Sequence, residues 1–561
     1  MSETKAPTTA PKSDVDIAQA HTLEPIADIA AKAGVDKDAL IPYGAHMAKV
    51  DVSRNPGEAD AKLVLVTGVS PTPAGEGKST VLIGLTDALA KLGHNAMVAL
   101  REPSLGPVMG IKGGAAGGGY SQVVPMEDIN LHFTGDFHAI TSANNTLAAM
   151  IDNHIHQGNE LNIDPRRVTW QRCLDVNDRS LRNVVTGLGG PTNGVPAQTG
   201  FTITAASEIM AILGLATDLD DLKEHLANIT IGLTYDQEPV TAGQLGAEGA
   251  MAALLKQAIN PNLVQTLGGT PAFIHGGPFA NIAHGCNTLL ATRTAMQYAD
   301  IVLTEAGFGS DLGAEKFFDI KARYGDLDVA GAVVVATVRS IKYNAGIARE
   351  DLEKENLDAL EQGISNLARH VENIRKFGVT PVVALNRFTS DTEAELEWIR
   401  NWAERTGVAI AEADVWSKGG EGATELATTL LENLSEGTST QLYDPADGIE
   451  ASIETIAREI YRADNVQYSV NASRDLKMLK ANGFDTLPVC ISKTQYSFSD
   501  EPSLLGAPTG HTLHVRKLIP RTGAGFVVAL TGDVMTMPGL PKTPAANNID
   551  VAEDGHITGL F

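Results

Sequence analysis

One short glycine-rich segment, residues 71–80 with the sequence PTPAGEGKST, constrains the fold more than any other part of the chain. It separates an apolar run, Leu63 to Thr67, from an amphipathic run that begins at Ser79. A strand, a glycine loop and a helix in this order suit phosphate, because backbone N–H groups and the positive helix N-terminus surround its oxygens. The segment therefore predicts an α/β fold that binds a nucleoside triphosphate.

The residues predicted to bind ATP are those of the loop itself: Thr72, Pro73, Ala74, Gly75, Glu76, Gly77, Lys78 and Ser79. Lys78 would neutralise the outer phosphates, and the hydroxyl of Ser79 suits Mg²⁺. The usual pattern GxxxxGK[ST] begins with glycine, whereas this chain carries Thr72. That departure weakens the bare motif, so the surrounding residues must support it.

The residues after the loop support the same reading. Apolar side chains recur at helical spacing and Gly93 follows them, which predicts a helix over residues 79–92 with a left-handed end. The next apolar run, Ala96 to Leu100, is closed by Arg101 and predicts a second, neighbouring parallel strand. Carboxyl ends of parallel strands share one sheet edge, so Arg101 is expected beside the glycine loop.

Composition narrows the class of protein. The chain has 561 residues and a net charge of −25, which argues against nucleic acid and anionic membranes as partners. Its three cysteines, Cys173, Cys286 and Cys490, lie far apart, so neither a disulfide framework nor a zinc site is indicated. No apolar run of about 18 residues and no secretory leader is visible, so neither secretion nor membrane spanning is expected and a cytoplasmic location is predicted.

Apolar runs alternate with helical patterns through most of the chain, which predicts a multidomain α/β protein with one main parallel sheet and smaller α/β domains. We expect a disordered tail at residues 1–16, a nucleotide-binding domain at 17–368, a second α/β domain at 369–437 and a C-terminal α/β domain at 438–561. Polar or aromatic residues follow many of the predicted strands, where ligands of open parallel sheets bind: Glu305, Arg339, Asn386, Arg387, Phe388, Trp416 and Lys493.

Five segments together resemble formate–tetrahydrofolate ligase, also called 10-formyltetrahydrofolate synthetase. They are residues 72–80 (TPAGEGKST), 101–107 (REPSLGP), 304–318 (TEAGFGSDLGAEKFF), 493–500 (KTQYSFSD) and 531–541 (TGDVMTMPGLP). The resemblance implies ATP-dependent ligation of formate to tetrahydrofolate in one-carbon metabolism, giving 10-formyltetrahydrofolate, ADP and phosphate through formyl phosphate. It also implies a homotetramer, and the length leaves no room for the extra domains of trifunctional forms.

The resemblance also implies roles for particular residues. Arg101 would bind formate and formyl phosphate and act with Lys78 as a catalytic residue, and Phe388 and Trp416 would sandwich the folate. Glu102 and Asp136 match positions that bind a monovalent cation, potassium or ammonium. In the folate-binding role, Phe388 and Trp416 would contribute flat aromatic faces to the pterin.

Plainer readings of the same residues stay open. Arg101 could pair with Glu102 at a strand end, either acidic residue could pair with a lysine, and a post-strand Phe or Trp could pack between domains. Glu305 resembles the Mg²⁺-linked or water-linked carboxylate of such proteins only by position. His275 and His284 flank a glycine-containing loop and are expected to be hydrogen-bonded there rather than metal-bound. The alternative function is a P-loop switch or partition ATPase.

Overall fold

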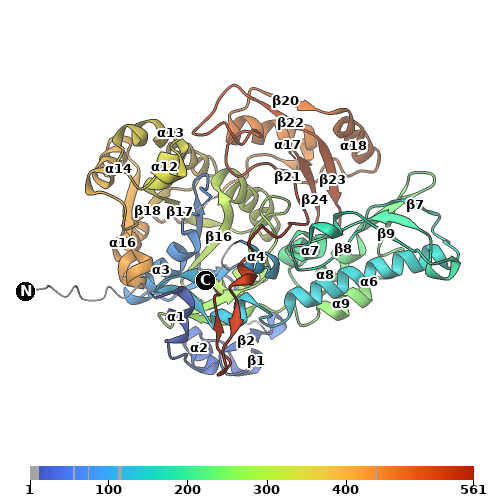
Figure 1. The fold of residues 1–561 in the computed structure, drawn as a ribbon, viewed down its shortest axis with the longest axis horizontal. Coiled ribbons are helices and arrows are strands. Elements are labelled where there is room, and N and C mark those ends of the chain that lie inside the picture. The colour runs from blue at the N-terminus through green and yellow to red at the C-terminus, as the bar shows by residue number, and fades with distance from the viewer. Residues whose placement is uncertain are drawn as a thin grey trace, which may run out of the picture.

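The computed structural model describes residues 12–54, 57–73, 75–111, 116–437, 439–532 and 534–560. Within these residues a twelve-stranded sheet forms the centre of the molecule (Figure 1). Ten strands follow one path: β1 (Leu40–Tyr43), β2 (Met47–Val50), β14 (Asn262–Thr266), β15 (Pro271–Ile274), β4 (Ala96–Leu100), β16 (Ile301–Gly309), β3 (Lys62–Gly68), β17 (Val329–Ala336), β18 (Pro381–Asn386) and β19 (Ala409–Ala413). The short strands β5 (Gly117–Gly118) and β6 (Ser121–Val124) branch from β14.

The sheet changes character at β15. From β1 to β15 along this path neighbouring strands are antiparallel, and from β15 to β19 they are parallel. The carboxyl ends of the parallel strands therefore meet at one side of the sheet, which we call the carboxyl edge. In such sheets ligands bind beyond this edge. The predicted α/β class is confirmed.

Helices cover both faces of the sheet, and the strand sequences explain why. In β3, Leu63 and Leu65 point into one buried core and Val64 and Val66 into another, as expected for a strand buried on both sides. The first face is covered by α10 (Leu289–Tyr298), α12 (Val338–Asn344), α13 (Leu357–Lys376) and α14 (Glu393–Thr406). The second is covered by α3 (Lys78–Lys91), α15 (Val415–Lys418) and α16 (Thr424–Asn433).

Helix α3 follows the glycine-rich segment almost as its sequence predicts. Its apolar residues, among them Val81, Leu82 and Leu85, are fully buried against the sheet. Gly77 is its N-cap, and Gly93 just beyond its end has φ +91°. The predicted range 79–92 is shifted by one residue at each end.

A helical lobe is inserted into the main sheet between β6 and β14 and lies at the right of Figure 1. It contains α6 (Asp136–His156), α7 (Glu208–Leu215), α8 (Leu219–Ala227), α9 (Glu248–Leu255) and a sheet of β7 (Ile163–Val168), β12 (Thr230–Thr234) and β13 (Pro239–Thr241). Smaller elements of this part of the chain are β8 (Arg172–Cys173) with β11 (Phe201–Thr202) and β9 (Val184–Thr186) with β10 (Ala197–Thr199). The lobe packs in a hydrophobic core that it shares with β21 (Val489–Ser492) and β24 (Phe526–Leu530).

The C-terminal region forms small sheets at the top of Figure 1. It contains α17 (Ile449–Ile456), β20 (Asn465–Tyr468), α18 (Val470–Ala481), β21 (Val489–Ser492), β22 (Thr512–Val515), β23 (Lys517–Arg521) and β24 (Phe526–Leu530). The last segment then returns across the body, where the backbone N–H of Ile557 donates to Glu127 at 3.0 Å. It ends in the hairpin β25 (Asp550–Val551) and β26 (Ile557–Thr558).

The remaining helices are α1 (Asp14–Gln19), α2 (Ile26–Ala33), α4 (Leu105–Gly110), α5 (Met126–Asn130) and α11 (Arg323–Gly325). Two π-helical turns, Ser310–Ala314 and Phe317–Ala322, follow β16. Across the described ranges, no helix is both long and apolar enough to cross a membrane.

Three expectations from the sequence need correction. The boundary predicted at residue 368 falls inside α13, and β18 and β19 continue the main sheet, so residues 369–437 form no separate sheet. Residues 14–16, assigned to a disordered tail, begin α1, which Ser13 caps; residues 1–11 lie outside the described part of the chain. Strands β3 and β4 are not neighbours, because β16 lies between them.

Candidate active site

The glycine loop, residues 71–77, connects β3 to α3 at the carboxyl edge. Gly75 and Gly77 have φ of +79° and +68°, the left-handed region that side chains disfavour. A Cβ atom on Gly77 would also lie 2.5 Å from the Nδ2 atom of Asn386. Since Gly77 is the N-cap of α3, the free N–H groups of the first helical turn face the loop. Ala74, one of the predicted ATP-binding residues, lies outside the described residues.

Glu76 braces this loop from inside. Its carboxylate accepts a hydrogen bond from the backbone N–H of Thr72 at 2.8 Å and another from the hydroxyl of Thr337, which opens α12. The side chain of Asn386, at the end of β18, donates to the backbone oxygen of Glu76 at 2.9 Å. The side chain of Glu76 is therefore committed to holding the loop shape. Asn386 and Thr337 hold it from the ends of β18 and β17.

Glu305 lies at the centre of the site. It belongs to β16, between the loop strand β3 and β4, and its side chain is fully buried. The hydroxyl of Ser79 donates to its Oε2 atom at 3.1 Å, and the Nε atom of Arg101 donates to its Oε1 atom at 3.3 Å. The Nζ atom of Lys78 lies 3.9 Å from Oε2 and also donates to the backbone oxygen of Ala306.

The charges around Glu305 leave a surplus of positive charge. Burial favours the neutral acid, but the charges of Arg101 and Lys78 outweigh it, so the pKa of Glu305 is held below its ordinary value. One ionised carboxylate thus orients two cations. Their side chains remain 14% (Lys78) and 22% (Arg101) exposed, so both can reach an anionic ligand.

Arg101 fits closely against the strand that carries Glu305. A Cβ atom on Gly307 would lie 3.0 Å from the Nη1 atom of Arg101 and 2.4 Å from the Cβ of Ala280, so only glycine leaves room there. The next residue, Phe308, has φ +61°, a strained value for a bulky side chain. The plain reading, in which Arg101 pairs with Glu102, is not what the structure shows, since its partner is Glu305.

The two residues predicted to hold a monovalent cation differ in how well they fit one. Glu102 is buried, and its Oε2 atom has no hydrogen-bond partner among the described residues. Burial and the nearby charge of Asp136 raise the pKa of Glu102. Asp136 instead pairs with the buried ammonium of Lys49 at 2.8 Å and accepts from Asn262 at 2.8 Å. Glu102 therefore has a carboxylate oxygen, Oε2, that could bind a cation, whereas the carboxylate of Asp136 is already paired with Lys49.

Phe388 and Trp416 follow the adjacent parallel strands β18 and β19, in which Asn386 pairs with Ala413. Both therefore lie at the carboxyl edge. Trp416 is 43% exposed, and its backbone oxygen accepts from the N–H of Tyr120 at 2.9 Å. One face of the Phe388 ring is covered by the guanidinium of Arg339, 3.7 Å from the ring centroid. Phe388 can therefore offer only its other face to a ligand.

The two histidines that flank the glycine-containing loop behave differently. His275 has hydrogen-bond partners on both ring nitrogens, Thr288 at 2.7 Å and the backbone oxygen of Ala258 at 2.6 Å, as predicted. His284 is fully buried, and neither of its ring nitrogens has a partner in the described part of the chain, so that prediction is wrong for His284. Burial and, next, the positive charge of Lys321 lower the pKa of His284 to about 3. Its imidazole is neutral.

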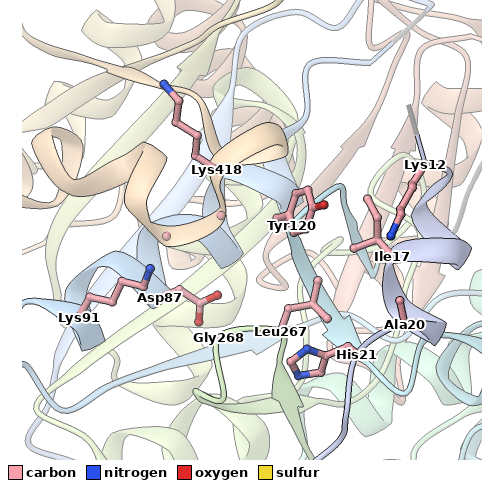
Figure 2. A pocket seen from close by; sticks show the side chains of 12 residues that line it. Lys12, Ile17, Ala20, His21, Asp87, Lys91, Tyr120, Leu267, Gly268 and Lys418 are labelled. Carbon is pink, nitrogen blue, oxygen red and sulfur yellow. The ribbon is translucent and has the colours of Figure 1, made fainter. Parts of the chain in front are cut away.

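No cluster of three or more metal-binding side chains occurs in the described ranges. A cavity of about 320 Å³, drawn in Figure 2, lies along α3 and is lined by Lys12, His21, Asp87, Lys91, Tyr120 and Lys418 among others. None of the predicted site residues lines it. This cavity is therefore separate from the residues predicted to form the site.

Sequence reasoning missed the supporting roles of Thr337 and Lys49. Thr337 directly follows β17, so its position at the carboxyl edge was a usable signal. Lys49 gave none, because a lysine inside the short strand β2 reads as an ordinary surface residue. Asn386 was noted as a post-strand residue, but its contact with the loop could not be read from the sequence.

Comparison with known proteins shows the family of this chain. A family model described as formate–tetrahydrofolate ligase matches residues 12–561. The chain is 70% identical to the formate–tetrahydrofolate ligase of Corynebacterium diphtheriae over 549 residues, covering 98% of this chain and 100% of that protein. It is 64% identical to the enzyme of Corynebacterium jeikeium over 573 aligned positions, with both chains fully covered, and 60% identical to that of Staphylococcus aureus over 551, covering 98% and 99%. The chain therefore belongs to the formate–tetrahydrofolate ligase family.

Proposed function

We propose that the carboxyl edge carries out this ligation in two steps, with Glu305 holding the two cations that serve both. The overall activity, ATP-dependent ligation of formate to tetrahydrofolate, follows from the family. The observation that carries the residue assignment is the contact of Ser79, Lys78 and Arg101 with one buried carboxylate. These contacts support a phosphate-binding site at Ser79 and Lys78 and a carboxylate-binding site at Arg101, both positioned by Glu305.

In the first step the glycine loop, a P-loop, binds the phosphates of ATP through its backbone N–H groups and Lys78. An oxygen of formate attacks the γ-phosphorus, the bond to the β,γ-bridging oxygen breaks, and ADP leaves. Negative charge spreads over the γ-phosphate oxygens in the transition state, and the ammonium of Lys78 stabilises it. The planar fork of Arg101 orients formate for this attack.

The second step transfers the formyl group. N10 of tetrahydrofolate attacks the carbonyl carbon of formyl phosphate, the bond from that carbon to the phosphate oxygen breaks, and phosphate leaves while N10 loses its proton. Formate itself resists such attack because its carboxylate is anionic, whereas the mixed anhydride has a good leaving group. Arg101 holds the phosphate end of the intermediate. Trp416 and the open face of Phe388 hold the pterin in place by stacking.

Two cations fit the side chains present. The hydroxyl of Ser79, beside the carboxylate of Glu305, offers the oxygen ligands that Mg²⁺ prefers, with the remaining positions left to phosphate and water. When bound, Mg²⁺ would supply further neutralisation of the phosphates. A potassium or ammonium ion would use the free oxygen of Glu102. By family likeness we also propose a cytoplasmic homotetramer.

The assignment of Arg101 is tested by Arg101→Ala and Arg101→Lys. Formate-dependent release of ADP should collapse in Arg101→Ala, and Arg101→Lys should restore part of it at higher formate concentration, because charge returns without the planar fork. ADP binding, measured by calorimetry, should change much less than formate dependence. Unchanged formate-dependent ADP release in Arg101→Ala would move the formate site elsewhere.

A further inference from the structure

Arg339 lies at the carboxyl edge but has no role in the steps above. It is in the first turn of α12, directly after β17, and β17 lies between the loop strand β3 and the strand β18 that leads to Phe388. Its guanidinium carbon lies over the ring of Phe388, 3.7 Å from the centroid. Arg339 is thus placed between the proposed ATP and folate sites.

The guanidinium of Arg339 has no ion pair and no hydrogen bond to any described residue, and its Nε atom is shielded from solvent. The other arginines of this edge are paired: Arg101 with Glu305 at 3.3 Å, and Arg387 with Glu412 at 3.3 Å. Asp391 lies in electrostatic reach of Arg339, but its carboxylate accepts from the backbone N–H of Phe388 at 2.8 Å.

An unpaired guanidinium in a partly buried position is costly, because buried polar groups are normally hydrogen-bonded. Stacking on an aromatic ring satisfies the face of the guanidinium but leaves its buried Nε atom without an acceptor among the described residues. The chain carries a net charge of −25, yet no acidic side chain of the described residues forms an ion pair or hydrogen bond with Arg339. A bound oxyanion would supply the missing acceptors.

We propose that Arg339 is a further substrate-binding residue, whose guanidinium, placed over the ring of Phe388, donates to an oxyanion of a substrate bound at the carboxyl edge. The proposal rests on the proposed function, which brings two such groups to this edge: the phosphates of ATP and the carboxylates at the glutamate end of tetrahydrofolate. Phosphate and carboxylate present the same paired oxygens to a planar fork. Separate binding experiments tell the two sources apart.

The test measures binding of ADP and of tetrahydrofolate separately, by calorimetry at low and high salt, in the wild type, Arg339→Gln and Arg339→Lys. Glutamine keeps a planar group that can lie on Phe388 but removes the charge. We expect the Kd of one ligand to rise about tenfold or more in Arg339→Gln, with a weaker salt dependence and partial recovery in Arg339→Lys. A rise for ADP identifies a phosphate, and a rise for tetrahydrofolate a carboxylate.

The matched control is Arg387→Gln, which removes an exposed arginine that already has a carboxylate partner on the next strand. It should leave both Kd values within about twofold. The proposal is overturned if Arg339→Gln, shown to be folded by an unchanged melting temperature, binds both ligands as the wild type does. It is also overturned if both Kd values rise equally with unchanged salt dependence, since that pattern reports only lost packing on Phe388. Loss of ADP binding in Lys78→Ala would meanwhile uphold the proposed function independently.

Discussion

Two regions of this chain concentrate charged residues, and they use them in opposite ways. At the carboxyl edge, Lys78 and Arg101 share the single carboxylate of Glu305 and keep part of their side chains exposed. In the segment that follows β16, residues 310–322, every charged side chain is shielded from solvent, and Asp311 pairs with Lys493 of the C-terminal region at 2.6 Å. The first arrangement leaves positive charge for a ligand, and the second neutralises charge inside the protein.

The difference shows how to separate charged residues that act on substrate from those that hold the structure. Removing one partner of a buried ion pair strongly destabilises the folded protein, because the other charge stays in a poorly solvating interior. Two cations that share one carboxylate and remain partly exposed, as Lys78 and Arg101 do, can instead bind an anionic ligand. The predictions for Lys78, Lys493 and Glu315 test this division, and the prediction for Trp416 tests the folate side of the carboxyl edge.

The largest effect is expected from Lys78→Ala. Formyl transfer should fall by about 100-fold or more, because a preorganised cation is removed from the transferring phosphate, while the melting temperature changes little. The matched control is Lys91→Ala at the far end of the same helix, where the side chain is exposed and pairs with Glu421. Activity retained in Lys78→Ala would mean that the glycine loop is not the phosphate site.

Lys493→Met should act on stability rather than on chemistry. Leaving Asp311 buried and unpaired should cost about 3–5 kcal/mol, read as a lower urea midpoint of unfolding. The double variant Asp311→Asn with Lys493→Met should be less damaged, because no lone charge remains. As a control, Lys354→Met breaks an exposed pair with Asp351 and should leave the midpoint nearly unchanged. An unchanged midpoint in Lys493→Met would remove the contrast between the two regions.

Trp416→Ala should raise the KM for tetrahydrofolate far more than the KM for ATP. Lost stacking on a flat ring costs about 1–3 kcal/mol if the pterin behaves as a stacked base does, which corresponds to roughly 5- to 150-fold. Trp416→Phe should recover part of the loss. If both KM values rise together, Trp416 supports the edge as a whole instead of contacting folate.

The fourth prediction concerns Glu315 and Asp319, a fully buried pair of carboxyl groups in the π-helical segment. Burial and the charge of Asp319 raise the pKa of Glu315, and burial raises the pKa of Asp319 to about 7. The folded protein therefore keeps protons that the unfolded chain releases above about pH 4. The free energy of unfolding should fall as the pH rises from about 4 towards 7, by at most about 1.4 kcal/mol per pH unit for each group.

Glu315→Gln should flatten this pH dependence, because the amide cannot ionise. Urea midpoints between pH 5 and pH 8 provide the measurement, with the exposed Glu361→Gln on α13 as the control. A slope equal to that of the wild type would show that Glu315 does not hold a proton in the folded state.

The sequence predicted local structure at the glycine loop well but could not predict which strands lie side by side. The order of β3, loop, α3 and β4 was readable because Lys62–Gly68 and Ala96–Leu100 are apolar runs around a helical pattern. That β16 inserts between β3 and β4 depends on a strand about 200 residues later. Because β16 lies there, Glu305 can contact both Ser79 and Arg101, which its position in the sequence alone did not reveal.

Side-chain partners were hardest to foresee. Glu76 reads as part of a phosphate-binding motif, yet it turns to Thr72 and Thr337, because the tight loop needs acceptors for its own backbone. The partner of Asp136 is Lys49, which lies 87 positions earlier and carries no sequence signal. The boundary predicted at residue 368 was wrong, because α13 runs through it and β18 and β19 continue the main sheet. A helix followed by further strands looks the same in the sequence whether those strands join the same sheet or begin a new domain.

The central claim is that the cations around Glu305 join formate to the γ-phosphate of ATP. Formate labelled with ¹⁸O, incubated with ATP and tetrahydrofolate, tests it by mass analysis of the released phosphate. The mechanism predicts that one oxygen of formate appears in that phosphate, with the transfer lost in Arg101→Ala and Lys78→Ala. Formation of 10-formyltetrahydrofolate with unlabelled phosphate would contradict the account.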